Sequence, residues 1–208
     1  MAKMTAKEMV EKAREVIGRE AASVLGIKEQ LDESIAKVVE SMFNCRGHIL
    51  VSGTGTSRAV ALRFAHLLAC CGSPGLFINA ADALHGGAGA VTANDILFVI
   101  SKGGHSREIN KFVEIAKGKG AKIIALSETD KSPLAEMCDA VYRIKAQEGV
   151  DPYGMIATGS SLTNAAACDV LCVLLMEMKG YTKEQFGVTH PEGAVGKKIA
   201  EQTNKKTK

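Results

Sequence analysis

Two glycine- and hydroxyl-rich segments are the parts of this chain best suited to chemistry. They read SGTGTS at 52–57 and SKGGHS at 101–106, and each lies between an apolar run and an amphipathic segment. Such a segment joins a buried strand to the first turn of a helix, where glycines let a ligand approach the backbone and free N–H groups favour an anion. The two segments together predict a phosphate-binding pocket. Its candidate residues are Gly53, Thr54, Gly55, Thr56, Ser57, Ser101, Lys102, Gly103, Gly104, His105 and Ser106.

Neither segment matches a nucleotide-binding loop. A dinucleotide fingerprint needs a third glycine, but Ala59 and Val60 stand where it would be. The acidic residue that should close the following strand is also missing, because that strand is expected to end at Asn79. The chain has no Gly-Lys-Ser/Thr at the first loop, which excludes a Walker A loop there. We therefore expect no nucleotide cofactor.

The composition describes the kind of protein that carries these loops. The chain has 208 residues, of which 46% are hydrophobic and 24% charged, so it fits one globular α/β domain with a helical extension. A net charge of +3 with few aromatic residues argues against nucleic acid. The sequence contains no apolar run of about 20 residues and no signal-peptide core, so we expect a cytoplasmic protein without a membrane segment. The six cysteines form no CxxC pair, and we expect no metal site.

The elements that must position the loops follow from hydrophobic periodicity. Apolar runs separated by amphipathic segments predict parallel strands covered on both faces, hence a doubly wound, three-layer αβα sandwich with a five-stranded parallel sheet, plus N-terminal helices. Strands are expected at 48–51, 76–79, 96–100, 122–126 and 140–144, and helices at 57–71, 106–117, 132–137 and 161–179. Residues 5–43 are expected to be helical, with Gly18 and Gly26 interrupting them. We divide the chain into a helical extension (1–45), an α/β domain that carries both loops (46–200) and a flexible tail (201–208).

The motifs resemble those of a known family. SGTGTS, the ALHGG element within 80–87, SKGGHSRE and THPEGAVG at 189–196 occur in the order found in sugar isomerase (SIS) domains. Over about residues 30–200 the chain looks most like the isomerase domain of bacterial arabinose 5-phosphate isomerases. The resemblance implies a flavodoxin-like SIS fold and interconversion of arabinose 5-phosphate and ribulose 5-phosphate. Many members continue into CBS regulatory modules. This sequence stops before them, so we expect that regulation to be absent.

The resemblance also implies which hydroxyls hold the phosphate. Carried over by position, they are Ser57 in the first loop and Ser101 and Ser106 in the second. A third family serine is replaced here by Gly103.

A second departure lies in the first loop, where these isomerases usually have an active-site lysine and this chain has Thr56. A neutral hydroxyl cannot supply that charge. Lys102 or Arg58 could reach the same anion. This departure makes a non-catalytic phosphosugar sensor the alternative to an isomerase.

The acid–base residues are likewise implied by the resemblance. Glu108 matches the glutamate after the second loop and would transfer a proton or bind sugar hydroxyls. Glu148 is the best match to a second active-site glutamate, with Asp151 as a rival. His190 matches the histidine assigned to ring opening, and histidine suits that role because its side chain can both donate and accept a proton near neutral pH. His85 matches a histidine that can enter a neighbouring subunit's site.

These residues would support aldose–ketose isomerisation through an enediol. The route needs a base between C1 and C2, a group that opens the ring, and stabilisation of the enediolate oxygen. It requires no cofactor. We expect a phosphosugar substrate, no nucleic-acid or membrane partner, and a homo-oligomer, with a tetramer favoured by the resemblance.

Overall fold

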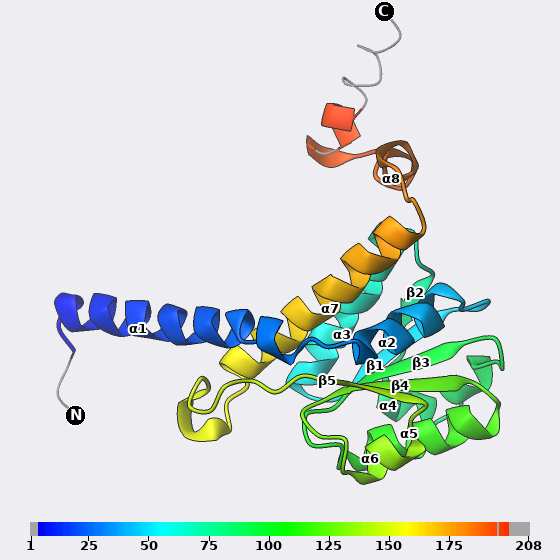
Figure 1. The fold of residues 1–208 in the computed structure, drawn as a ribbon, viewed down its shortest axis with the longest axis horizontal. Coiled ribbons are helices and arrows are strands. Elements are labelled where there is room, and N and C mark those ends of the chain that lie inside the picture. The colour runs from blue at the N-terminus through cyan, green and yellow to red at the C-terminus, as the bar shows by residue number, and fades with distance from the viewer. Residues whose placement is uncertain (1–3, 195, 200–208) are drawn as a thin grey trace, which may run out of the picture.

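The chain folds around one parallel β-sheet, shown in Figure 1. A computed structural model describes residues 4–194 and 196–199, so the predicted tail at 201–208 lies outside the described residues. The strand order in this part is β2-β1-β3-β4-β5, and all neighbours pair in parallel. The strands are β1 (Ile49–Gly53), β2 (Gly75–Phe77), β3 (Ile96–Ile100), β4 (Lys122–Ser127) and β5 (Ala140–Arg143). This flavodoxin-like order confirms the predicted fold class.

Helices cover both faces of the sheet (Figure 1). The described helices are α1 (Ala6–Leu25), α2 (Ser34–Phe43), α3 (Thr56–Cys70), α4 (Ala80–Ala83), α5 (Arg107–Gly118), α6 (Pro133–Met137), α7 (Thr158–Met178) and α8 (Lys183–Thr189), with short 3₁₀ turns at Lys28–Gln30, Gly87–Ala90 and Pro152–Gly154. Strand β3 shows how the layers form. Ile96, Phe98 and Ile100 face the core that includes α2, α3 and α7, whereas Leu97 and Val99 face α4, α5 and α6.

The predicted elements differ from the structure in the helices more than in the strands. Gly18 does not interrupt α1, because the helix is continuous through it and a Cβ at this position would meet nothing within 4 Å. Gly26 does end that helix. The prediction missed the short helices α4 and α8. Helix α7 begins at Thr158, three residues before the predicted start.

Helix α7 is long and apolar enough to cross a membrane by length and composition. In this fold it packs against one face of the sheet as a core helix. Its buried residues Ala167, Cys168, Leu171, Cys172 and Leu175 pack in one cluster with strand side chains. The cytoplasmic location stays a prediction.

The chain reverses direction across the sheet between β1 and β3. It leaves β1 toward β2 on one side and returns to place β3 on the other side. The register pairs Ser52 with Val99 and Gly53 with Ile100, so the two strands end at the same level. Loops 52–57 and 101–106 therefore leave neighbouring strands at the carboxyl edge, at the topological switch point where ligands bind in such sheets.

Candidate functional site

The first loop turns tightly from β1 into α3. A Cβ on Gly53 would lie 2.8 Å from the carbonyl carbon and oxygen of Ser57 and 3.1 Å from the amide of Arg58, so only glycine allows this approach. Helix α3 begins at Thr56 after Gly55, and no side chain caps it. The first N–H groups of a helix have no partner within the helix. The loop therefore presents backbone donors at the switch point.

The second loop has the same design. Gly104 adopts φ +70°, and a Cβ there would run into Oγ of Ser132. Ser106 occupies the N-cap position of α5, but its side chain makes no capping hydrogen bond. Ser101 is buried at the end of β3. A second helix N-terminus is thus left without a side-chain cap beside the first.

Two cations near these loops, Lys102 and Arg58, already have neighbours. Lys102 Nζ lies 3.8 Å from Oε1 of Glu128, a half-buried carboxylate that follows β4. The Lys102 carbonyl accepts hydrogen bonds from the Glu128 amide at 3.0 Å and from Ser127 Oγ at 3.1 Å. Arg58 lies 5.5 Å over the ring of Phe77. These contacts anchor the second loop to β4 and hold Arg58 against β2.

A hollow of about 710 Å³ opens beside the second loop. Its lining includes His105 and Glu108 from the loop and the first turn of α5, together with Leu84. His85 follows Leu84 and is exposed. The structure therefore brings together the predicted residues His105 and Glu108. His85 does not line the hollow, but it directly follows Leu84, which does.

Asn110 is a polar residue of this hollow that the sequence prediction missed. Its Nδ2 donates to the Gly104 carbonyl at 3.2 Å, which ties α5 to the second loop. Its Oδ1 is buried without a hydrogen-bond partner among the described residues, and so is Oγ of Ser52 at the end of β1. Only the position of Asn110, two residues after Glu108, could have indicated it.

The loop after β5 places the two candidate carboxylates, Asp151 and Glu148, in different surroundings. Asp151 is buried, and its Oδ1 accepts hydrogen bonds from the amide of Gly159, from the Ser160 amide at 3.1 Å and from Thr158 Oγ1 at 3.1 Å. Burial alone would raise the pKa of this carboxyl, but the hydrogen bonds from Ser160, Gly159 and Thr158 outweigh it and lower the pKa. Asp151 therefore caps the start of α7.

Within the described part of the chain Glu148 does not cap a helix, and it forms an ion pair at the surface. Its side chain is 90% exposed and lies 3.3 Å from Lys145 Nζ, which is a weak surface pair. Glu148 is thus the available carboxylate of this loop, although it is not held against the hollow.

His190 lies at the opposite edge of the sheet. Helix α7 starts beside Asp151 at the carboxyl edge and rises over 21 residues, about 30 Å. At its other end Lys179 Nζ donates to Ser73 Oγ at 2.8 Å, just before β2 begins. Helix α8 lies beyond that end of α7 (Figure 1), and His190 follows it, stacked on Phe186 with ring centroids 3.8 Å apart. The chain therefore does not bring its own His190 to the two loops.

Comparison with known proteins agrees with this geometry. The model of the family described as SIS domain matches residues 42–176. The chain belongs to the SIS domain family. "Arabinose 5-phosphate isomerase KpsF" of Escherichia coli is 31% identical over 192 residues, covering 92% of this chain and 61% of the relative. The chain thus spans about three fifths of that relative's length.

Two solved structures are similar over most of this SIS domain. One, from Listeria monocytogenes, is a protein provisionally assigned as a sugar-phosphate isomerase, with a TM-score of 0.88 and 33% identity over 91% of this chain and 100% of that chain. The other is protein c3406 of Escherichia coli CFT073 in complex with arabinose 5-phosphate, with a TM-score of 0.87 and 26% identity over 90% of this chain and 100% of that chain. The similarity to sugar-phosphate isomerases therefore extends over most of the chain.

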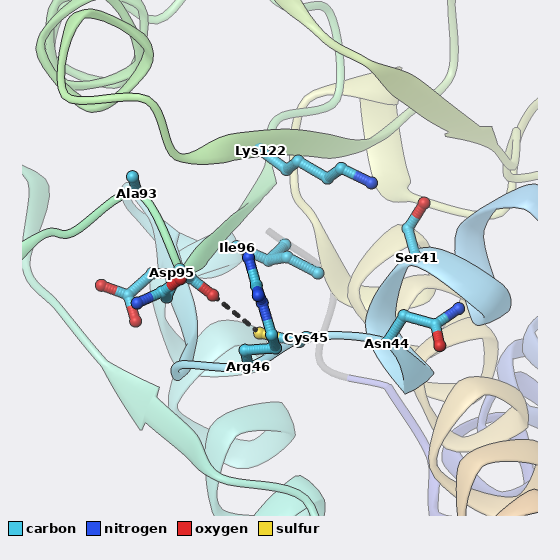
Figure 2. Close-up of a pocket in the computed structure, with 9 residues that line it drawn as sticks. Ser41, Asn44, Cys45, Arg46, Ala93, Asp95, Ile96 and Lys122 are labelled. Carbon is cyan, nitrogen blue, oxygen red and sulfur yellow. Dashed lines mark hydrogen bonds between the residues drawn. The ribbon is translucent and has the colours of Figure 1, made fainter.

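A second cavity of this SIS domain, of about 170 Å³, lies at the amino edge of the sheet. Figure 2 shows Lys122 at the start of β4 and Arg46 before β1 lining it, with Ser41 and Cys45. The nearby carboxylate of Asp95 is fully engaged. Its Oδ1 accepts from the His48 amide at 2.7 Å, and its Oδ2 from the amide and hydroxyl of Thr92 at 2.7 and 2.9 Å. This cavity lies at the edge away from the two loops.

No cluster of three or more potential metal-ligating side chains occurs among residues 4–194 and 196–199.

Proposed function

We propose that this SIS domain is a phosphosugar aldose–ketose isomerase that interconverts arabinose 5-phosphate and ribulose 5-phosphate or a closely related pair. One observation carries the proposal. Helices α3 and α5 follow neighbouring strands at the switch point, and both lack a side-chain cap. A hollow lined by Glu108 lies beside the start of α5. The similarity to arabinose 5-phosphate isomerases and to a protein solved in complex with arabinose 5-phosphate supports this substrate class.

The two loops would hold the phosphate. Backbone N–H groups at the starts of α3 and α5 match an anion's need for donors, and both helix dipoles point their positive ends at it. Hydroxyls of Ser57, Ser101 and Ser106 would add donors, as would His105. Thr56 contributes a hydroxyl where related isomerases usually have lysine, so the backbone must supply more of the attraction.

Glu108 would move the proton between C1 and C2. A carboxylate there takes the C2 proton of the aldose, and O1 gains a proton as the electrons form the enediol. The proton then returns at C1 while the O2 hydroxyl gives up its proton, which yields the ketose. The exposed carboxylate of Glu148 would accept hydrogen bonds from the sugar hydroxyls. The route consumes no redox equivalent and needs no cofactor.

A complete site would require a second copy of the chain. His190 lies about the length of α7 away from its own chain's loops, so a ring-opening role for His190 needs an assembly in which it reaches a neighbour's site. His85 is exposed and could act within its own chain or across an interface. We therefore expect a homo-oligomer, with a tetramer favoured, in the cytoplasm.

Deuterium exchange tests the proposal directly. Pure protein is incubated with arabinose 5-phosphate in D₂O, and NMR follows ribulose 5-phosphate and deuterium at C2. The expected result is turnover that Glu108→Gln lowers about 10²–10⁴-fold, the usual contribution of a general base. Glu177→Gln, an exposed glutamate near the far end of α7, is the matched control and should retain full activity.

The alternative function has its own outcome in this experiment. Thermal stabilisation by arabinose 5-phosphate without any deuterium incorporation, at high protein concentration and across related pentose and hexose phosphates, would make the chain a phosphosugar sensor. Thr56, which replaces the usual lysine, is the observation that favours this second candidate.

A further inference from the structure

The N-terminal half of α1 is a helix without a partner in its own chain. Every residue from Met4 to Glu15 is exposed. In Figure 1 this half extends away from the layers around the sheet. A helical segment of this length is marginal in water unless its apolar face is packed. Met9 and Val10 are nonetheless about half exposed, at 51% and 49%. The segment therefore needs a partner that its own chain does not provide.

The other half of α1 borders an open apolar groove of about 700 Å³. The groove lies between α1 and α7, with the bidentate Arg63–Asp169 pair also in its lining. Ile17 and Leu25 are 65% and 70% exposed. The apolar lining residues are Ile17, Ala21, Val24, Leu25, Leu162, Ala165 and Ala166. One half of α1 thus carries an uncovered apolar face, and the other half borders a groove that could receive one.

The sequence of α1 is self-complementary about Ile17. Apolar residues at equal distances before and after Ile17 are alike: Met9 with Leu25, Val10 with Val24, and Ala13 with Ala21. At three residues on either side, Arg14 and Glu20 carry opposite charges. At 100° per residue, Val10, Ala13, Ile17, Ala21 and Val24 share one face of the helix. This symmetry is what two identical helices need in order to pair antiparallel.

We propose that two copies of the chain associate through antiparallel α1 helices around a two-fold axis at Ile17. Ile17 meets the partner's Ile17, and the exposed half of each α1 fills the groove of the other copy. The contact is isologous, because each copy gives the same half-helix and the same groove. It is independent of the proposed activity, since a sensor would use the same surface.

The charges on α1 favour this direction of pairing. Arg14 of one copy lies at the same height along the helix pair as Glu20 of the partner subunit. Neither Arg14 nor Glu20 has an ion-pair partner within the described part of its own chain. A parallel arrangement would instead set Arg14 beside the partner's Arg14 and Glu20 beside the partner's Glu20. Like charges at close range oppose that arrangement.

Cysteine cross-linking tests the axis. In Ile17→Cys full-length protein, diamide takes up two hydrogens as two thiols become one disulfide, and a covalent dimer should form in most of the protein. Val10→Cys alone should not cross-link, because the two sulfurs would lie about 20 Å apart along the helices. A mixture of Val10→Cys and Val24→Cys proteins should cross-link. Lys12→Cys, on the opposite face of the same helix, is the matched control, and the unmodified chain controls for its six native cysteines.

The mass of the assembly provides a second test. Ile17→Glu should halve the mass measured by light scattering while the circular dichroism spectrum stays native, because Ile17 is mostly exposed in the single chain. Ile115→Glu, on α5 in the opposite layer, should leave the mass unchanged. A monomeric unmodified chain, an unchanged mass for Ile17→Glu, or efficient cross-linking of Val10→Cys alone would each overturn the proposal.

Discussion

The junctions that lead from β1, β2, β3 and β4 into their helices along the carboxyl edge fall into two pairs. The outer junctions, β2–α4 and β4–α6, begin their helices with a side-chain cap. Asn79 Oδ1 accepts from the Ala81 amide at 2.9 Å, and Ser132 Oγ accepts from the Ala135 amide at 3.2 Å. The inner junctions, β1–α3 and β3–α5, have no such bond, although Ser106 carries the right side chain.

We attribute this difference to the proposed phosphate site, which lies at the inner junctions. A side-chain cap stabilises a helix by about 1 kcal/mol, so leaving two neighbouring helices without one forgoes stability. The uncapped pair lies at the switch point, where the first-turn N–H groups of both helices could donate hydrogen bonds to the same anion. A ligand that binds there replaces the missing caps, whereas the outer junctions are already satisfied.

The largest expected effect comes from breaking the inner junction at Gly104. Gly104→Ala places a Cβ at φ +70° and against Ser132 Oγ, with Leu134 Cβ at 3.2 Å. We expect a loss of about 2–4 kcal/mol in the free energy of unfolding and loss of phosphosugar binding, measured by urea denaturation and calorimetry. Gly103→Ala is the matched control, because its Cβ would approach only His105, at 3.8 Å. Equal stability of the two variants would contradict the role given to Gly104.

The sequence predicts all five strands to within two residues at each end. Buried parallel strands are nearly continuous apolar runs, and ILFVI at 96–100 is covered on both faces. Gly18 shows where local reasoning fails. Its neighbours in α1 form the helix and its ion pairs, so one exposed glycine lowers stability without ending the helix.

The site itself divides in the same way. Loops 52–57 and 101–106 are predictable because each follows a recognisable strand, and strand order then brings them together. The position of His190 depends on the direction of α7 and on α8, which no short-range pattern reveals. The choice between Glu148 and Asp151 depends on which carboxylate faces the start of α7. That is a tertiary contact, and it assigns Asp151 to capping.

Asp151 extends the comparison to α7. The N-cap residue of α7 makes no side-chain cap, and Asp151 in the preceding loop accepts the hydrogen bonds of its first amides instead. Asp151→Asn keeps the shape but removes the charge that interacts with the helix N-terminus, and we expect a loss of about 1–2 kcal/mol at neutral pH. The pKa of Asp151 is lowered in the folded chain. The stabilisation is therefore full above the ordinary carboxyl pKa and is lost as the pH falls through the lower folded value.

Urea denaturation at pH 7 and at acid pH measures this dependence, and the difference between the unmodified chain and Asp151→Asn should shrink in acid. Glu148→Gln is the control from the same loop. Its exposed carboxylate should contribute less than about 0.5 kcal/mol at either pH. A stability difference for Asp151→Asn that is independent of pH would refute the capping role of the charge.

The smallest effect is the most informative, because it compares two serines that occupy the same N-cap position in different helices. Ser132→Ala removes a cap, so it should lower the free energy of unfolding by about 1 kcal/mol and leave phosphosugar affinity unchanged. Ser106→Ala removes no hydrogen bond in the free protein, so stability should change by less than about 0.5 kcal/mol. Its affinity for arabinose 5-phosphate should fall about 10-fold, the effect of losing one hydrogen bond to a charged group. Calorimetric titration and urea denaturation of both variants measure the two quantities. If Ser106→Ala lowered stability and spared binding, the inner junctions would be ordinary helix starts, and the proposed phosphate site would lose its main support.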